Sequence, residues 1–178
     1  KYTASLGFDG TNDNVSVTSD GLDDISPATY SFWFYPKSGG DDYGGIISKG
    51  TSFTIDKQDS TNSLEFYHQC FGNSMYALTP DNSIQLNTWQ HVSATWDGTC
   101  NLSGVKIYLN GVSQALSGAS ATNPPTSDAA DNLHIGVNDV ASSYFTGMID
   151  DVRIYNYALT PTQVKLLYNN SSAVQFGQ

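Results

Sequence analysis

Short runs of β-branched and aromatic residues, broken by clusters of turn residues, limit the fold of this chain more than any other feature. Val, Ile, Thr, Tyr, Phe and Trp fill the runs, whereas Gly, Asn, Asp and Ser fill the breaks. Helical periodicity is nearly absent, and this pattern is typical of antiparallel all-β proteins. We expect strands at residues 5–8, 14–17, 29–35, 45–48, 53–56, 64–71, 75–78, 89–96, 105–109, 112–116, 133–137 and 145–155.

The clearest turn is Asn110-Gly111, which lies between two apolar runs. Both central residues of a type I′ turn need positive φ, and Asn-Gly satisfies this need best, so a tight hairpin is expected here. Residues 117–130 contain no aromatic residue and show no period, and they include a Pro-Pro pair. This stretch is expected to be a surface loop between strands.

One helix is expected near the C-terminus. Thr160 is its expected N-cap, Pro161 takes the first helical position, and Gln163 completes a capping box. Apolar residues then recur at helical spacing and give the segment one apolar side. The helix should end near Asn169 or Asn170.

The composition fits one folded domain. The chain has 178 residues, of which 39% are hydrophobic and 12% aromatic, enough for a single packed core. No internal repeat or low-complexity tract divides it. We expect one antiparallel β-sandwich over residues 1–170, followed by a loose tail at 171–178.

The charge balance excludes several partners. Seventeen acidic residues face seven basic ones, which gives a net charge of −10. Nucleic acids and anionic membrane surfaces are held mainly by Lys and Arg, so neither is an expected partner. Glu65 is the only glutamate, and the aspartates fall in turn-rich segments. Aspartate suits turns and metal-binding loops.

The two cysteines and the chain ends bear on the cellular compartment. Cys70 and Cys100 are expected to close one disulfide in an oxidising compartment, and two buried free thiols are the alternative. No apolar run approaches the length of about 18 residues that a spanning helix needs, so no direct membrane insertion is expected. Lys1 is not a start methionine, which indicates a processed or trimmed product.

Several short phrases follow one another in a characteristic order. They are SLGFDG at 5–10, YSFWFYP at 30–36, IISKG at 46–50, NTWQHV at 87–92, WDG at 96–98, VKIYLNG at 105–111, GMIDDVRIYN at 147–156, AL at 158–159 and LY at 167–168. In this order they resemble the laminin G-like branch of the concanavalin A-like lectin/glucanase superfamily, over residues 5–170.

The resemblance implies a fold and leaves the function open. The implied fold is all-β, a two-sheet antiparallel jelly-roll sandwich, and our reading of the sequence adds one short C-terminal helix. Proteins of this kind are extracellular or lie on surfaces, and they include sugar-binding modules, adhesion domains, calcium-dependent lectins and glycosidases. The site residues must therefore decide the function.

Catalysis is not expected. The glucanase relatives carry a Glu-x-Asp-x-x-Glu strand, whereas this chain has the lone Glu65, although an aspartate pair stays open as a substitute. Lyases of similar fold use Arg, His and Tyr, but Arg153 is the only arginine and belongs to the family phrase. No Gly-x-Ser-x-Gly elbow occurs, and His91 and His134 are expected at the edge of the core.

A structural calcium ion is the expected cofactor. Asp9 and Asp13 lie four residues apart across a glycine turn, and the resembled fold places the first and last strands side by side, which brings Asp150 towards that turn. The alternative is that Asp9 and Asp13 cap the turn while Asp150 and Asp151 bind Arg153 or backbone N–H groups.

Loops at one end of the sandwich are the expected ligand site, because loops usually carry function. Sugar recognition needs a flat aromatic ring and planar polar groups. Asp42, Tyr43, Asn138 and Tyr144 rank highest as ligand-binding residues. The same Asp42 and Asn138 turns stay open as a second, ligand-bridging calcium site. The other aromatic candidates are Tyr67, His68 and Tyr76, each of which has a packing role as its alternative.

These observations favour a non-catalytic, secreted or cell-surface module that binds a glycan or a surface protein and belongs to a larger protein. A structural or protein-interaction domain of a surface or filament protein is the alternative. A small hydrolase with an unfamiliar carboxylate pair is the third candidate.

Overall fold

The computed structural model describes residues 5–18, 21–138 and 142–171 and is dominated by β-strands. One α-helix and one short 3₁₀ helix complete it. The elements, in chain order, are β1 (Leu6–Asp9), β2 (Val15–Val17), β3 (Ala28–Pro36), β4 (Gly44–Lys49), β5 (Phe53–Gln58), β6 (Ser63–Cys70), β7 (Asn73–Leu78), β8 (Gln90–Trp96), η1 (Leu102–Gly104), β9 (Val105–Leu109), β10 (Val112–Ser113), β11 (Ser117–Ala119), β12 (Leu133–Ile135), β13 (Val137–Asn138), β14 (Ser143–Tyr144), β15 (Thr146–Tyr155) and α1 (Pro161–Ser171).

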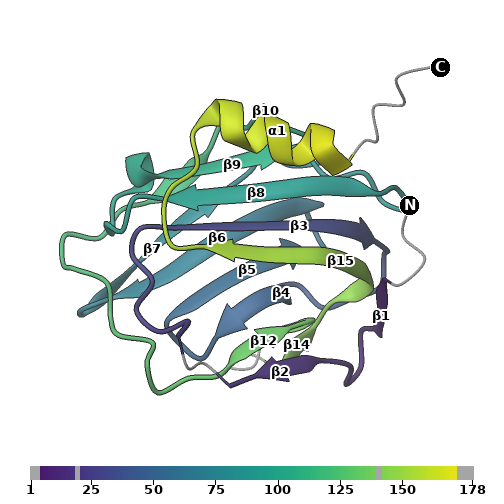
Figure 1. Cartoon of the computed structure of the whole chain (residues 1–178). Helices are drawn as coiled ribbons and strands as arrows, with labels where there is room; N and C mark the ends of the chain where they lie inside the picture. The colour runs from purple at the N-terminus through teal and green to yellow at the C-terminus, as the bar shows by residue number, and fades with distance from the viewer. Residues whose placement is uncertain (1–4, 19–20, 139–141, 172–178) are drawn as a thin grey trace.

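The strands form two layers that face each other (Figure 1). One sheet has six strands in the order β1-β15-β3-β8-β9-β10, and the other has nine, with the main path β11-β7-β6-β5-β4-β12-β2. All pairings are antiparallel except a single parallel contact between β14 and β4. The expected all-β sandwich of two antiparallel sheets with one short C-terminal helix is therefore confirmed.

The beginning and the end of the sandwich lie side by side in the six-stranded sheet. Leu6 pairs with Ile149 and Asp9 with Thr146, so β1 forms the edge next to β15. β15 continues to β3 with a register shift between Asp150 and Arg153. The pairing of first and last strands implied by the family resemblance is thus confirmed.

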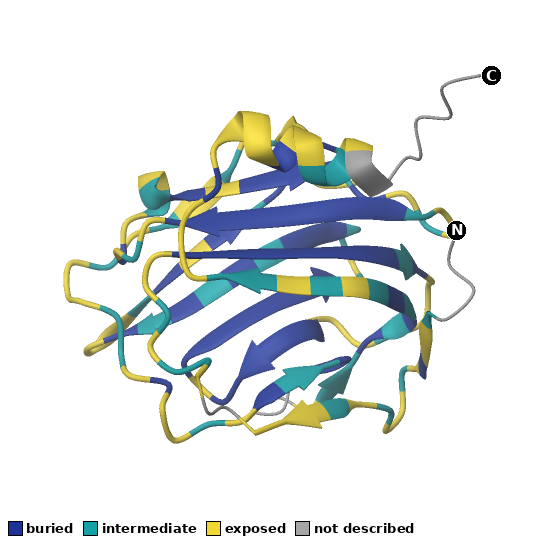
Figure 2. Cartoon of the chain, viewed as in Figure 1, coloured by how far each residue is buried: buried dark blue, intermediate teal, exposed yellow. Residues whose placement is uncertain are grey.

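Buried residues lie along the strands of both sheets (Figure 2), and the core between the sheets is rich in aromatic rings. Phe32 and Phe34 of β3 are fully buried and meet edge to face, and Tyr30 stacks on Phe53 of β5 at 4.3 Å between ring centroids. Aromatic side chains supply much buried area per residue, which suits a sandwich of short strands. The pair Phe32 and Phe34 is therefore the core pair of this strand.

Helix α1 covers the outer face of the six-stranded sheet. Trp33 and His91 lie on that face and contact the ring of Tyr168 at 5.9 and 6.0 Å between centroids. His91 is buried, and its Nε2 lies 3.0 Å from Ser31 Oγ. β3 and β8 are therefore buried on both faces (Figure 2). His91 has the packing role that the sequence favours.

Both local signals in the sequence are confirmed. Asn110 and Gly111 have φ of 50° and 74°, as a type I′ turn requires. Thr160 Oγ1 accepts a hydrogen bond from Gln163 N at 3.4 Å, while Gln163 Oε1 accepts one from Thr160 N at 2.8 Å. This reciprocal pair is a capping box.

The segment after the hairpin differs from its prediction. The strand expected at 112–116 is short, and β11 forms inside the expected loop 117–130, where it pairs with β7. The open edge of β7 offers backbone partners that no sequence period reveals. Helix α1 extends to Ser171, slightly beyond its predicted end, and residues 172–178 of the expected tail lie outside the described chain.

A buried lysine ties two loops to the nine-stranded sheet. Lys49 at the end of β4 is 3% exposed and donates to Leu22 O, Asp23 Oδ1 and Asp128 Oδ1, each at 2.9 Å. Asp128 also accepts a hydrogen bond from Asp24 N. A buried charge needs such partners, so this network fixes both loops against β4.

Cys70 and Cys100 form a disulfide, so the first of the two alternatives is the observed one. The bond joins the end of β6 to the loop after β8 and therefore links the two sheets.

We expect reduction of this bond, or the double change Cys70→Ala and Cys100→Ala, to destabilise the domain. The cysteines are 30 residues apart, and closing a loop of that size contributes about 3 to 4 kcal/mol. For a domain of this size the melting midpoint should fall by roughly 10 °C. Calorimetry with and without a reductant measures the change, and an unchanged midpoint would contradict the prediction.

Candidate functional site

The outer face of the nine-stranded sheet carries a row of polar and aromatic side chains. In β5 and β6, alternate residues point to the core, as Phe53 and Phe66 do, and the residues between them point away from it. Cross-strand pairing places Thr54 opposite Tyr67 and Asp56 opposite Glu65 on the outer face. Strand alternation and register together therefore build this face.

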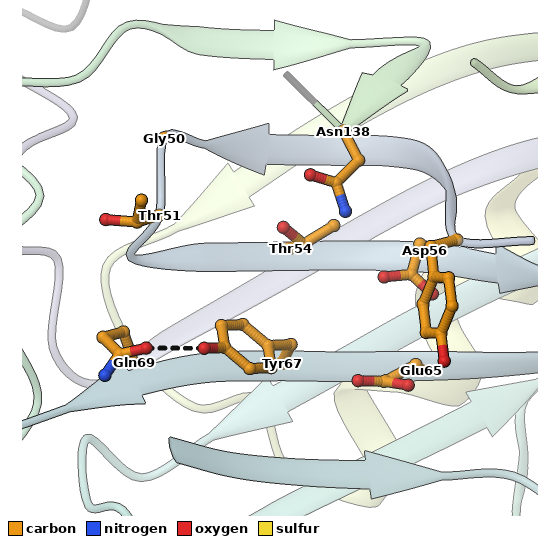
Figure 3. A pocket seen from close by; sticks show the side chains of 9 residues that line it. Gly50, Thr51, Thr54, Asp56, Glu65, Tyr67, Gln69 and Asn138 are labelled. Atoms are coloured by element: carbon orange, nitrogen blue, oxygen red, sulfur yellow. Dashed lines mark hydrogen bonds between the residues drawn. The ribbon is translucent and has the colours of Figure 1, made fainter. Parts of the chain in front are cut away.

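A hollow of about 370 Å³ opens on this face (Figure 3). Polar groups from strands β5, β6 and β13 and from the β4–β5 turn surround it, and two tyrosines contribute their rings. Its lining residues are Tyr43, Gly50, Thr51, Thr54, Asp56, Glu65, Tyr67, Gln69 and Asn138. The Tyr67 hydroxyl donates to Gln69 Oε1 at 2.5 Å, which orients the ring and the amide (Figure 3).

Two carboxyl groups form part of the lining. Asp56 is 2% exposed, and Glu65 is partly buried beside it. The Gln58 amide donates to Asp56 Oδ1 at 2.8 Å and to Glu65 Oε2 at 3.1 Å. Among the ion pairs of the described residues, none includes either carboxyl group. One neutral amide is therefore the shared hydrogen-bond donor of the two acids.

This environment disfavours ionisation of both acids. Burial raises the pKa of Glu65 to about 7. Burial, and next the charge of Glu65, raise the pKa of Asp56 well above its ordinary value, while the hydrogen bond from Gln58 opposes that rise. Two like charges in a poorly solvated place cannot both form readily.

A second hollow of about 450 Å³ adjoins the first. It lies over β6 and β7 and shares Tyr43 and Glu65 with the first hollow. Tyr76, which is 36% exposed, and Asp81 contribute to its far side. We call the two hollows together the sheet groove.

Asn138 reaches the sheet groove because β13 lies unusually close to β4. A Cβ atom at Gly45 would collide with the backbone of Val137 and Asn138, so only glycine permits this approach. Tyr43 lies directly before β4, has a φ of 66° and also lines the groove. Local backbone features thus bring two side chains from separate loops together.

The structure brings together only part of the predicted ligand-binding set. Tyr43 and Asn138 line the same hollow. Asp42 accepts a hydrogen bond from Ser60 N at 2.7 Å, and Tyr144 N donates to Asp41 at 3.3 Å, so these residues close neighbouring turns. Neither Asp42 nor Tyr144 is among the residues that line the sheet groove. Their role in ligand binding stays a prediction.

The three predicted calcium ligands are not assembled. Asp13 Oδ2 accepts from Asp9 N at 3.0 Å, and Asp9 Oδ1 accepts from Thr11 N at 2.8 Å, as in a capped turn. Asp9 pairs with Thr146, so Asp150 lies four residues along β15, roughly 13 Å away at strand spacing. Nor do the described residues hold any other group of three His, Cys, Asp or Glu side chains able to bind a metal.

Asp150 and Asp151 have the partners expected in the absence of a bound ion, namely Arg153 and a backbone N–H group. Asp150 Oδ1 accepts from Asp151 N, and Asp151 binds Arg153 in a bidentate pair. Asp139, part of the alternative ligand-bridging site, lies outside the described residues. The set Asp9, Asp13 and Asp150 therefore does not fit one ion, because the β1–β15 register separates its last member.

Sequence reasoning missed the principal groove residues Thr54, Asp56 and Gln69. Alternation within each strand indicates that they face away from the core. The pairing of Asp56 with Glu65 depends on the β5–β6 register, which the sequence does not state. His68 points to the core and stacks on Trp96, so it is not exposed as a ligand platform.

The chain matches one family model and resembles parts of two longer receptors in sequence. A family model described as Laminin_G_3, concanavalin A-like lectin/glucanases superfamily, matches residues 9–165. Adhesion G-protein coupled receptor D1 of Bos taurus is 28% identical over 150 residues, which are 80% of this chain and 15% of the receptor. Adhesion G-protein coupled receptor V1 of Danio rerio is 28% identical over 79% of this chain and 2% of the receptor. The chain thus spans less than a fifth of either relative.

Solved structures show the same fold at low identity. The ligand binding domain of botulinum neurotoxin serotype D, in complex with N-acetylneuraminic acid, has a TM-score of 0.74 at 14% identity over 97% of this chain and 43% of that chain. A heptameric SAP-like pentraxin from Limulus polyphemus has a TM-score of 0.62 at 18% identity over 92% and 81%. These likenesses concern the fold alone.

We expect the Asp56–Glu65 pair to make the domain less stable as the pH rises. The folded state holds protons that the unfolded chain has already lost, so its stability falls as the pH climbs from the ordinary Glu value of 4.5 through about 7. Glu65→Gln should flatten this fall, with Asp151→Asn as the exposed control. Melting midpoints between pH 5 and 8.5 measure it, and parallel curves for Glu65→Gln and wild type would refute it.

Calcium binding stays a prediction, now limited to the turn that holds Asp9 and Asp13. Calcium that binds the native state raises the melting midpoint by mass action. We expect this rise to disappear in Asp13→Asn and to persist in Asp150→Asn, because Asp150 lies apart from the turn. Melting curves with calcium and with excess chelator test this. An unchanged wild-type midpoint would show that the native domain does not bind calcium.

Proposed function

Since the chain belongs to the Laminin_G_3 family of the concanavalin A-like lectin/glucanases superfamily, we propose that it is a non-catalytic extracellular module that binds a glycan in the sheet groove. The observation that carries this proposal is the hollow of about 370 Å³ with Tyr43 and Tyr67 in its lining. Sugars present an apolar face to aromatic rings and hydroxyl groups to planar polar side chains.

The polar lining supports a hydroxyl-rich ligand. Asn138 contributes an amide to the lining and Thr54 a hydroxyl. Gln69 Nε2 donates to Cys70 O and Asn73 O, so Gln69 presents its Oε1 as an acceptor. Tyr67 is only partly buried, so its ring borders the hollow instead of filling it. The arrangement therefore pairs an apolar platform with directional polar groups from several strands.

The carboxyl pair favours binding over hydrolysis. A glycosidase leaves the space between its two carboxyl groups to the scissile bond and, in inverting enzymes, to a water molecule. Here the Gln58 amide donates to both Asp56 and Glu65 and so ties the two carboxyl groups to one neutral partner. This geometry supports a module without turnover.

An extracellular setting and a larger parent protein are also part of the proposal. The disulfide between Cys70 and Cys100 suits an oxidising compartment. The adhesion receptors that the chain resembles are far longer than this chain. Among the residues that the structure describes, no helix has the length and hydrophobicity to cross a bilayer.

We expect Tyr67→Ala to weaken glycan binding about tenfold, because one aromatic platform contributes about 1 to 1.5 kcal/mol. Tyr157→Ala is the control, since Tyr157 is exposed and lies outside the sheet groove. A glycan array followed by calorimetry on its best binder gives the two affinities.

Chromatography of the same mixtures checks for released sugar. Equal losses in both variants would place the site elsewhere, and a folded protein that binds no glycan would favour the structural or protein-interaction alternative. Product release would show an enzyme.

A further inference from the structure

The sheet groove is longer than one sugar unit needs. Its two hollows, about 370 and 450 Å³, adjoin at Tyr43 and Glu65 and cross strands β5 to β7. The aromatic residues Tyr43, Tyr67 and Tyr76 are distributed over both. A continuous groove with rings along it fits several consecutive units of a linear chain better than a single terminal sugar.

The charges along this groove all have one sign. Its lining contains Asp56, Glu65 and Asp81, and no Lys, Arg or His is among the described residues that line either hollow. The lysines of β4 and β5 are engaged elsewhere, because Lys49 binds Asp23 and Asp128, and Lys57 binds Asp59. A glycan carrying carboxylate or sulfate groups would meet repulsion here without a compensating partner.

Asp56 and Glu65 form a carboxyl pair whose surroundings favour the protonated form. Asp56 and Glu65 are directly opposed on neighbouring antiparallel strands, and Gln58 occupies one oxygen of each. Both side chains line the first hollow, and their burial makes two negative charges costly there. The other titratable groups that line the groove are Tyr43, Tyr67, Tyr76 and Asp81, and none is a cation.

The groups around this pair leave its charge unbalanced. On β4 the cross-strand neighbour of Asp56 is Gly45, and on β7 the cross-strand neighbour of Glu65 is Leu78. Both neighbours are uncharged. Asp42, beside Tyr43, accepts from Ser60 N, and His68 of β6 lies on the core face. Burial accordingly raises the pKa of Glu65 to about 7.

We propose that the ligand of the sheet groove is an uncharged linear glycan, and that the Asp56 and Glu65 pair selects it through a carboxyl proton that is donated to a sugar hydroxyl. This inference rests on the proposed function and specifies its ligand class. With the proton present, the pair both donates and accepts hydrogen bonds, as sugar hydroxyls require. Loss of the proton leaves two acceptors and two like charges, which weakens the contact.

The test uses an array of linear oligosaccharides in matched sets of equal length. One member of each set is uncharged, one carries uronate or sialic acid, and one carries free amino groups. Wild type, Glu65→Gln and Asp151→Asn are compared at pH 5.5 and 8.5, and their folding is checked by circular dichroism. Asp151→Asn removes one exposed negative charge on the other sheet, and Asn tolerates the φ of 51° found there.

Affinity for the uncharged glycans is expected to fall as the pH rises. Wild type and Asp151→Asn should bind uncharged members, with affinity falling about tenfold from pH 5.5 to 8.5, because the protonated fraction of a group with a pKa near 7 falls by more than that. Glu65→Gln stays neutral and keeps an amide donor, so its affinity should be nearly equal at both pH values. Should Glu65→Gln not fold, Asp56→Asn is the second variant. It keeps Glu65, whose pKa is raised by burial, so its affinity should still fall between pH 5.5 and 8.5.

Two results would overturn the inference while leaving glycan recognition intact. One is tightest wild-type binding to the acidic or the amino-bearing members. The other is wild-type binding to uncharged members that does not change with pH. Folded protein that binds no member at either pH would remove the proposed function itself, and this inference with it.

Discussion

The antiparallel register between β5 and β6 decides what both faces of the nine-stranded sheet do. The side-chain period of a strand is two, so a slip by one residue would exchange the two faces. The observed register sends Phe53 and Phe66 into the core and sets Asp56 opposite Glu65 on the outer face. Packing and site chemistry are therefore specified by the same set of backbone hydrogen bonds.

Interactions outside the sheet groove fix the strands and loops that line it. The buried Lys49 ties two loops to the end of β4, and the close approach permitted by Gly45 holds β13 against the same strand. The disulfide from Cys70 fixes the end of β6 to the opposite sheet. These contacts stabilise the strand ends and loops, which limits the ways in which the groove can rearrange.

Shared fold and shared ligand need not coincide. The serotype D neurotoxin domain, crystallised in complex with N-acetylneuraminic acid, has the same fold as this chain with a TM-score of 0.74. That ligand is an acidic sugar, whereas Asp56, Glu65 and Asp81 line the sheet groove here. Function in such folds depends on the side chains placed on a common scaffold, and the identities of 14 to 18% say little about those.

Local patterns in the sequence determined most strands, the Asn110-Gly111 turn and the capping box at Thr160, because these depend on propensities and short-range hydrogen bonds. They also identified Tyr43 and Asn138 as candidates. The order of short phrases along the chain identified the family by resemblance. Only the tertiary structure decided that β11 joins β7, that Asp150 lies apart from Asp9, and that Asp56 meets Glu65. Each of these three depends on the register between strands, which is set by the packing of the whole sandwich and is not encoded in any single segment.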